Sequence, residues 1–111
     1  MDVNDETVGD ALVVMPRGRL DSNTSPAFEA HLLGRVEGPA RVVVDFTGLD
    51  YISSAGLRVL LMASKKARQG GAKLALCGLQ PAVREVFEIS GFLSILTVCD
   101  DRAQALARVA G

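Results

Sequence analysis

The stretch that decides the fold is residues 42–61, which read VVVDFTGLDYISSAGLRVLL. Its first part, Val42–Val44, is a β-branched apolar run, which is typical of a strand buried on both faces. A connection containing Gly, Asp and Ser follows, and leucines then recur at helical spacing. The stretch therefore predicts a buried strand, a loop over Thr47–Ser54 and a helix over Ala55–Gln69 that the next two glycines end.

Strands and helices alternate on both sides of this stretch. The strands Val3–Val8 and Ala11–Met15 flank a Gly-Asp turn, and Pro16 is expected to end the second because proline lacks a ladder donor. The other predicted elements are a helix from Ser25 that Gly38 ends, a strand over Lys73–Cys77, a helix from Pro81 that Gly91 ends, a strand over Ile95–Val98 and a last helix capped by Asp100 or Asp101.

This order predicts one α/β domain over residues 1–111 with a mixed five-stranded sheet. An N-terminal hairpin is followed by βα units, whose strands pair in parallel. Because such crossovers are right-handed, sequential neighbouring strands would place the crossover helices mainly on one face of the sheet. The other face then has only the last helix to cover it.

Composition narrows the class of protein. The 111 residues are 49% hydrophobic and carry a net charge of −1, without the clustered Lys and Arg that nucleic acids or anionic membranes attract. No apolar run is long enough to insert in a membrane, and no signal peptide is visible. Cys77 and Cys99 lack metal-ligand spacing, and we expect them to be small buried apolar residues. Unpaired cysteines are typical of a reducing compartment, which predicts a cytoplasmic protein.

Enzyme signatures are missing from the sequence. Its single histidine, His31, lies within a predicted helix, and no nucleophile elbow, phosphate-binding loop or dinucleotide fingerprint occurs. We expect Asp100 or Asp101 to cap a helix. We expect the basic residues Lys65, Lys66 and Arg68 to lie at the solvated end of a helix. We therefore expect a protein that is not an enzyme and that has no cofactor and no metal.

One loop stands out, because ligands and partners of α/β sheets gather at the carboxyl ends of the strands. There Ser53 and Ser54 precede a helix whose first N–H groups point outward and favour an anion. Either serine is a candidate N-cap, and either is a candidate phosphorylation site. Gly56 matters in both cases, since a side chain there would crowd the helix start or an approaching partner.

The same stretch resembles the signature of STAS domains, in particular the anti-sigma factor antagonists. Further similarity lies in Gly18–Asp21, a Gly-x-Leu-Asp loop, in Gly71–Leu74 and in Pro81–Val83, so the resemblance covers nearly the whole chain. In that family an unphosphorylated antagonist binds an anti-sigma factor that is also a serine kinase, and this frees the sigma factor. Phosphorylation of a serine at the start of the second helix then releases the antagonist, and a phosphatase resets it.

The resemblance assigns roles to residues of this chain. Alignment on Gly56 and Leu57 makes Ser54 the phosphorylated serine, with Ser53 as the second choice, and puts Asp21 on the loop aspartate beside it. Two departures are Ser53, where many members have an acid, and Ala55, where serine is frequent. The partner-binding surface that the resemblance implies consists of Asp21, Ser22, Asn23, Thr24, Ser53, Ser54, Ala55, Gly56 and Leu57.

Two other interpretations remain open at this point. The domain could be a non-switching STAS subunit of a membrane lipid-transport or sensory complex, in which the serine only caps the helix. A small enzyme or a nucleotide-binding protein is disfavoured by the missing catalytic residues. A monomer is the default expectation, with the uncovered sheet face as a candidate dimer surface.

Overall fold

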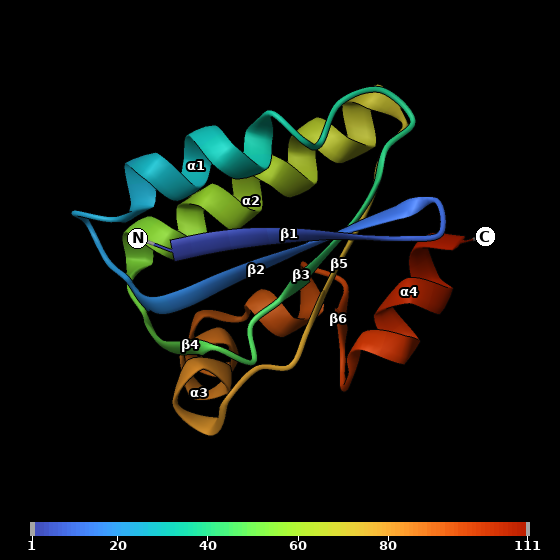
Figure 1. Ribbon diagram of the computed structural model, residues 1–111. Helices are drawn as coiled ribbons and strands as arrows, with labels where there is room; N and C mark the ends of the chain where they lie inside the picture. Colours follow the sequence, from blue (N-terminus) through green and yellow to red (C-terminus); the bar gives the residue numbers. More distant parts are fainter. Residues whose placement is uncertain (1, 111) are drawn as a thin grey trace.

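The main sheet has the strand order β1-β2-β3-β5-β6 (Figure 1). In the computed structural model, which describes residues 2–110, β1 (Asp2–Val8) and β2 (Ala11–Leu20) form the predicted antiparallel hairpin. The strands β3 (Arg41–Asp45), β5 (Lys73–Cys77) and β6 (Val98–Cys99) then follow in parallel. Sequential strands are thus neighbours, and the predicted α/β fold with its mixed sheet is confirmed.

A sixth strand, β4 (Leu49–Ile52), lies where the sequence predicted a loop. It pairs in parallel with the second half of β2, with Leu20 opposite Ile52. The predicted end of β2 at Pro16 was therefore wrong. Backbone groups alternate sides along a strand, so Pro16 faces the same side as Gly18, whose N–H donates to Gly48 O at 3.0 Å. The β3 pairing ends at Val14 and the β4 pairing begins at Gly18, so no ladder bond is lost at the proline.

Helices cover the two faces of the sheet unequally, as predicted. The helices α1 (Ser25–Leu33), α2 (Ser54–Gly70) and α3 (Pro81–Ser90) share one apolar cluster, and α4 (Arg102–Ala110) packs against a second cluster on the opposite face. Alternation along β3 shows the division, because Val42 and Val44 join the larger cluster and Val43 the smaller. Figure 1 shows α1 and α2 side by side, with α4 apart from them.

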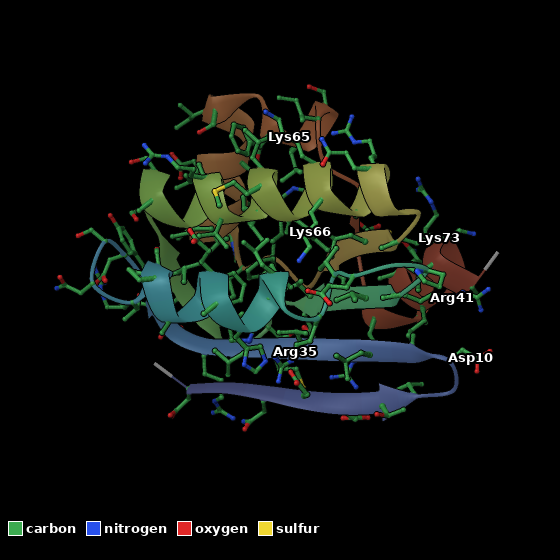
Figure 2. All side chains as sticks on the ribbon, turned by 90° about the horizontal axis from the view of Figure 1, so that it is seen from above. Asp10, Arg35, Arg41, Lys65, Lys66 and Lys73 are labelled. Atoms are coloured by element: carbon green, nitrogen blue, oxygen red, sulfur yellow. The ribbon has the colours of Figure 1, made fainter. Side chains whose placement is uncertain are left out.

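The first helix is shorter than its apolar spacing predicted, since it ends at Leu33 with Gly34 as its C-cap. Lys66 of α2 donates from Nζ to the carbonyl oxygen of Leu33 at 2.7 Å and lies 3.2 Å from Glu37 Oε1. Figure 2 shows Lys66 between α1 and α2. This lysine therefore satisfies an orphan carbonyl group at the end of α1 and joins the two helices.

Of the predicted strand over Ile95–Val98 only Val98 is in a strand, the two-residue β6, which extends to Cys99. A 3₁₀ turn, η1 (Phe92–Ser94), follows α3, and the N–H groups of Ile95 and Leu96 both donate to the carbonyl oxygen of Phe92. These turn bonds hold the backbone out of the sheet until Thr97, whose carbonyl oxygen accepts from Leu76 N–H at 2.8 Å. Within residues 2–110, the first part of β5 therefore has no strand beside it on this edge.

A carboxylate and a guanidinium fix α4 to the sheet. Asp45 at the end of β3 is only 8% exposed, and its Oδ2 accepts from Arg102 Nη2 at 3.1 Å and from Nε at 3.2 Å. Its Oδ1 accepts from the Thr47 hydroxyl at 2.6 Å. Burial acts to raise the pKa of Asp45, but the bonds from Thr47 and Arg102 outweigh it and hold that pKa below 3.8. Asp101 caps α4, as predicted, through Gln104 N–H at 2.9 Å.

Candidate functional site

The end of β2 and the start of α2 meet at a backbone hydrogen bond. The N–H of Ser53 donates to the carbonyl oxygen of Leu20 at 2.8 Å, one residue beyond the pairing of Leu20 with Ile52. The loop that follows Leu20 therefore lies beside the residues that begin α2. The tertiary structure thus joins the two halves of the predicted site, Asp21–Thr24 and Ser53–Leu57.

The loop Asp21–Thr24 is a closed polar turn. Asp21 Oδ1 accepts from the N–H of Asn23 at 2.9 Å and from the N–H of Thr24 at 3.1 Å. Thr24 Oγ1 accepts from Asp21 N–H at 2.9 Å and donates to Arg19 O at 2.8 Å. The bonds from the backbone N–H groups of Thr24 and Asn23 lower the pKa of the half-buried Asp21, so its carboxylate is negative at neutral pH. Ser22 and Asn23 project into solvent at the tip of the turn.

The two candidate serines differ in exposure. Ser53 is the N-cap of α2 with extended backbone, but its side chain makes no capping hydrogen bond. Its Oγ is buried and has no hydrogen-bond partner among residues 2–110. Ser54 is the first residue of the helix and its side chain is exposed. Ser54 therefore lies on the surface, whereas the hydroxyl of Ser53 points into the protein.

Gly56 and Leu57 lie beneath this surface rather than on it. A Cβ atom at position 56 would lie 2.8 Å from side-chain carbons of both Leu20 and Ile52, so only glycine lets α2 approach so closely. Leu57 is 5% exposed and belongs to the larger apolar cluster. Of the predicted partner-binding residues these two therefore shape the site from within, and Ala55 is half-buried beside them.

The sequence did not single out Arg19 and Tyr51, which border the same surface. The Arg19 guanidinium carbon lies 4.1 Å from the centre of the Tyr51 ring, a cation–π contact, and Tyr51 is 39% exposed. Their strands pair directly, with Arg19 opposite Tyr51 in the register of β2 and β4. The sequence does carry a signal for this pair, the short apolar pattern of residues 49–52. Interpreting that pattern as a strand would have placed Tyr51 in the sheet.

Electrostatics at the start of α2 favour negative charge. No acidic residue occupies its first turn, and Ser53 leaves the first helical N–H groups without a side-chain cap. Such groups and the helix dipole stabilise an anion.

Within residues 2–110 no group of three or more His, Cys, Asp or Glu side chains could hold a metal ion, and no helix is both long and apolar enough to cross a membrane. His31 instead contacts Asp5, with Nε2 2.7 Å from its carboxylate.

Comparison with known protein families identifies this arrangement. The family model described as STAS domain matches residues 2–105, nearly the whole chain. The chain belongs to the STAS domain family. This STAS domain is 50% identical over 97 residues to BtrV of Bordetella bronchiseptica, whose name proposes an anti-sigma factor antagonist; the match covers 86% of this chain and 84% of that protein.

Other relatives of this STAS domain carry related names. The anti-sigma F factor antagonist of Paenibacillus polymyxa is 27% identical, over 88% of this chain and 86% of that protein. The crystal structure of an anti-sigma factor antagonist from Mycobacterium paratuberculosis has the same fold, with a TM-score of 0.89 at 22% identity, over 99% of this chain and 94% of that one. Each of these names describes an antagonist of an anti-sigma factor.

Proposed function

We propose that this STAS domain is a cytoplasmic anti-sigma factor antagonist that acts by partner switching. Unphosphorylated, it binds a kinase-type anti-sigma factor and so frees the sigma factor. Phosphorylation of Ser54 releases it, and a serine phosphatase restores it. The observation that carries the proposal is the exposed hydroxyl of Ser54 at the start of α2, next to a Ser53 hydroxyl that is buried.

The charge of a phosphate explains the release. Phosphorylation adds a charge of about −1.5 to −2 and three acceptor oxygens. The Asp21 turn borders the start of α2 through the bond from Ser53 N–H to Leu20 O, and its carboxylate is already negative. A partner that packs on both segments would have to desolvate two neighbouring negative groups, which disfavours docking.

The start of α2 also explains why the fold would survive the modification. The uncapped first turn favours a negative group, and the side chain of Ser54 lies outside both apolar clusters. Phosphorylation would therefore alter the docking surface and leave the packing of Gly56 against Leu20 and Ile52 intact.

The test begins with the anti-sigma factor captured from the native cell by a Ser54→Ala variant, which cannot be released by phosphorylation. Incubated with this factor and ATP, the native chain and its Ser53→Ala control should each gain the mass of one phosphate, and Ser54→Ala should gain none. Ser54→Asp should bind the factor at least about tenfold more weakly than Ser54→Ala, because the added charge opposes docking. Equal phosphorylation of Ser54→Ala would overturn the site assignment.

The same experiment separates switching from fixed binding. A partner that binds the native chain, Ser54→Ala and Ser54→Asp equally would contradict partner switching. Such a result would make the chain a non-switching STAS subunit, in which the surface around Asp21 and Ser54 holds a permanent partner.

A further inference from the structure

The outer edge of β5 is open along its first half. Only Leu76 and Cys77 pair with β6, so the edge beside Lys73–Ala75 has no strand in the part of the chain that the structure describes. Lys73 donates to Ala40 O on the β3 side, and Leu76 donates to Thr97 O on the β6 side. Because these directions alternate, the N–H and the C=O of Leu74 both point to the open edge.

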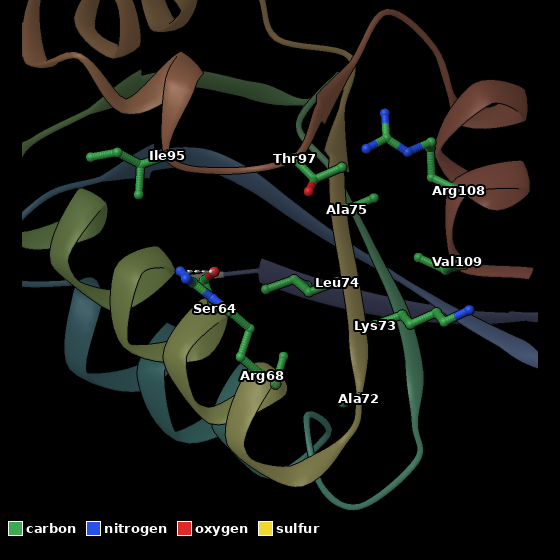
Figure 3. Close-up of a pocket in the computed structure, with 11 residues that line it drawn as sticks. Ser64, Arg68, Ala72, Lys73, Leu74, Ala75, Ile95, Thr97, Arg108 and Val109 are labelled. Carbon is green, nitrogen blue, oxygen red and sulfur yellow. Dashed lines mark hydrogen bonds between the residues drawn. The ribbon is translucent and has the colours of Figure 1, made fainter. Parts of the chain in front are cut away.

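This edge forms the floor of a groove with a volume of about 390 Å³. Ser64 and Arg68 of α2 line one wall, Arg108 and Val109 of α4 line the other, and Ile95 and Thr97 close one end. Figure 3 shows the strand edge between these two helices, with Arg108 on the side of Thr97. The groove continues the line of β6, which is only two residues long.

Positive charge borders the groove. Arg68, Lys73 and Arg108 all line it, and none of its eleven lining residues is acidic. None of the three forms an ion pair among residues 2–110, although the whole chain has a net charge of −1. Among the described residues, the Arg68 side chain makes one hydrogen bond, from Nη2 to Ser64 Oγ at 3.4 Å. Ile95 at the end of the groove is 50% exposed.

We propose that this groove binds an extended acidic peptide segment of a partner protein, which adds to the open edge of β5 as a strand in line with β6. A peptide main chain fits the donor and the acceptor that Leu74 presents together, whereas a bare anion would be repelled by that carbonyl oxygen. Acidic side chains of the segment would face the three cations, and an apolar side chain would cover the exposed Ile95.

The groove is a second surface, separate from the proposed switch. Ser64 and Arg68 lie in the last turns of α2, about 15–20 Å along the helix from Ser54 at a rise of 1.5 Å per residue. A partner could therefore hold this edge while the surface near Ser54 exchanges anti-sigma factors. Its test does not depend on phosphorylation.

The experiment is an NMR titration of the ¹⁵N-labelled chain with a blocked pentapeptide of four glutamates around a central valine, which presents glutamate on both faces of the added strand. We expect shifts at the amides of Leu74, Thr97 and Arg108, slower solvent exchange of the Leu74 amide, and a dissociation constant below about 1 mM. Arg108→Glu and Arg68→Glu should each weaken binding by about tenfold, since each places like charge beside the peptide. Arg58→Glu, on an exposed part of α2 outside the groove, is the matched control and should bind like the native chain.

Two further probes separate strand addition from charge alone. The same peptide with alternate N-methyl groups cannot form ladder bonds and should bind at least about tenfold more weakly. Inorganic phosphate should not displace the native peptide at equal concentration. Equal binding of the methylated peptide, displacement by phosphate, or no shift at these residues up to millimolar peptide would each overturn the proposal.

Discussion

Gly56 of α2 packs against Leu20 of β2 so closely that a Cβ atom on the glycine would lie 2.8 Å from Leu20 Cγ. The side chain of Ile52 closes the same space from β4 at 2.8 Å. The beginning of the helix that carries Ser54 is thus held against the ends of two strands. The position of the serine therefore depends on a residue without a side chain.

Gly56→Ala should lower the free energy of unfolding by about 1–3 kcal/mol, because both buried neighbours must shift to admit the methyl group. Urea denaturation followed by circular dichroism measures the change. Gly70→Ala is the matched control, since its Cβ would meet nothing nearer than 3.6 Å and the change should be neutral or stabilising. Equal stability of native chain and Gly56→Ala would show that α2 is not held by this contact.

Ser53→Ala should leave the free energy of unfolding unchanged or raise it by up to about 1 kcal/mol, although an N-cap serine usually stabilises its helix. The reason is that the buried Oγ of Ser53 has no hydrogen-bond partner among the described residues. The matched control is Ser25→Ala, which should cost about 1 kcal/mol because the buried Ser25 hydroxyl donates to Asp21 O at 2.5 Å. A loss at position 53 as large as that at position 25 would show that Ser53 caps α2.

Asp45→Asn should lower the free energy of unfolding at pH 7 by about 1–3 kcal/mol, because Arg102 and Thr47 lose a buried carboxylate partner. The folded pKa of Asp45 lies below 3.8, so its contribution is present above that value and is lost as the pH falls through the folded pKa. The variant should therefore lose less stability than the native chain when the pH falls below about 4.

Denaturation curves between pH 7 and pH 2.5 measure both effects of Asp45→Asn. Asp100→Asn, at an exposed residue whose carboxylate makes none of the described hydrogen bonds, should follow the native curve. A parallel acid dependence of Asp45→Asn and native chain would mean that the Arg102 contact does not perturb this carboxyl group.

Cys77 should resist thiol reagents in the folded protein. Burial is the main cause that raises the pKa of its thiol to about 12, so almost no thiolate exists at pH 8. In a Cys99→Ala variant, labelling by a disulfide reagent should be negligible in buffer and complete in denaturing urea. Rapid labelling of this variant without denaturant would contradict the burial of Cys77 between β3 and β6.

The local sequence determined most of the elements and their order. The apolar run at Val42–Val44 specified a strand buried on both faces, and Gly70–Gly71 ended the following helix, because composition and spacing encode burial and helix length. The hairpin and the parallel order followed from the turn glycine and from the alternation of strands with helices. The serine pair at the carboxyl edge of the sheet followed from this order.

Long-range pairing was beyond the local sequence. β4 exists because Leu49–Ile52 meets the second half of β2, and Pro16 stays in that strand because its missing donor falls between two ladders. Neither fact is visible until the partner strand is placed. The strand over Ile95–Val98 was overestimated for the same reason, since the turn bonds to Phe92 O compete with the ladder.

For the site, the sequence by itself determined which residues stand at the start of α2, and its resemblance to STAS domains indicated a role for them. Only the tertiary structure decided how they differ. It buried the hydroxyl of Ser53 and exposed that of Ser54, it turned Gly56 and Leu57 inward, and it brought the Asp21 turn alongside through Leu20. The physical reason is that exposure depends on packing between β2, β4 and α2, which are separate in the chain and meet only in the fold.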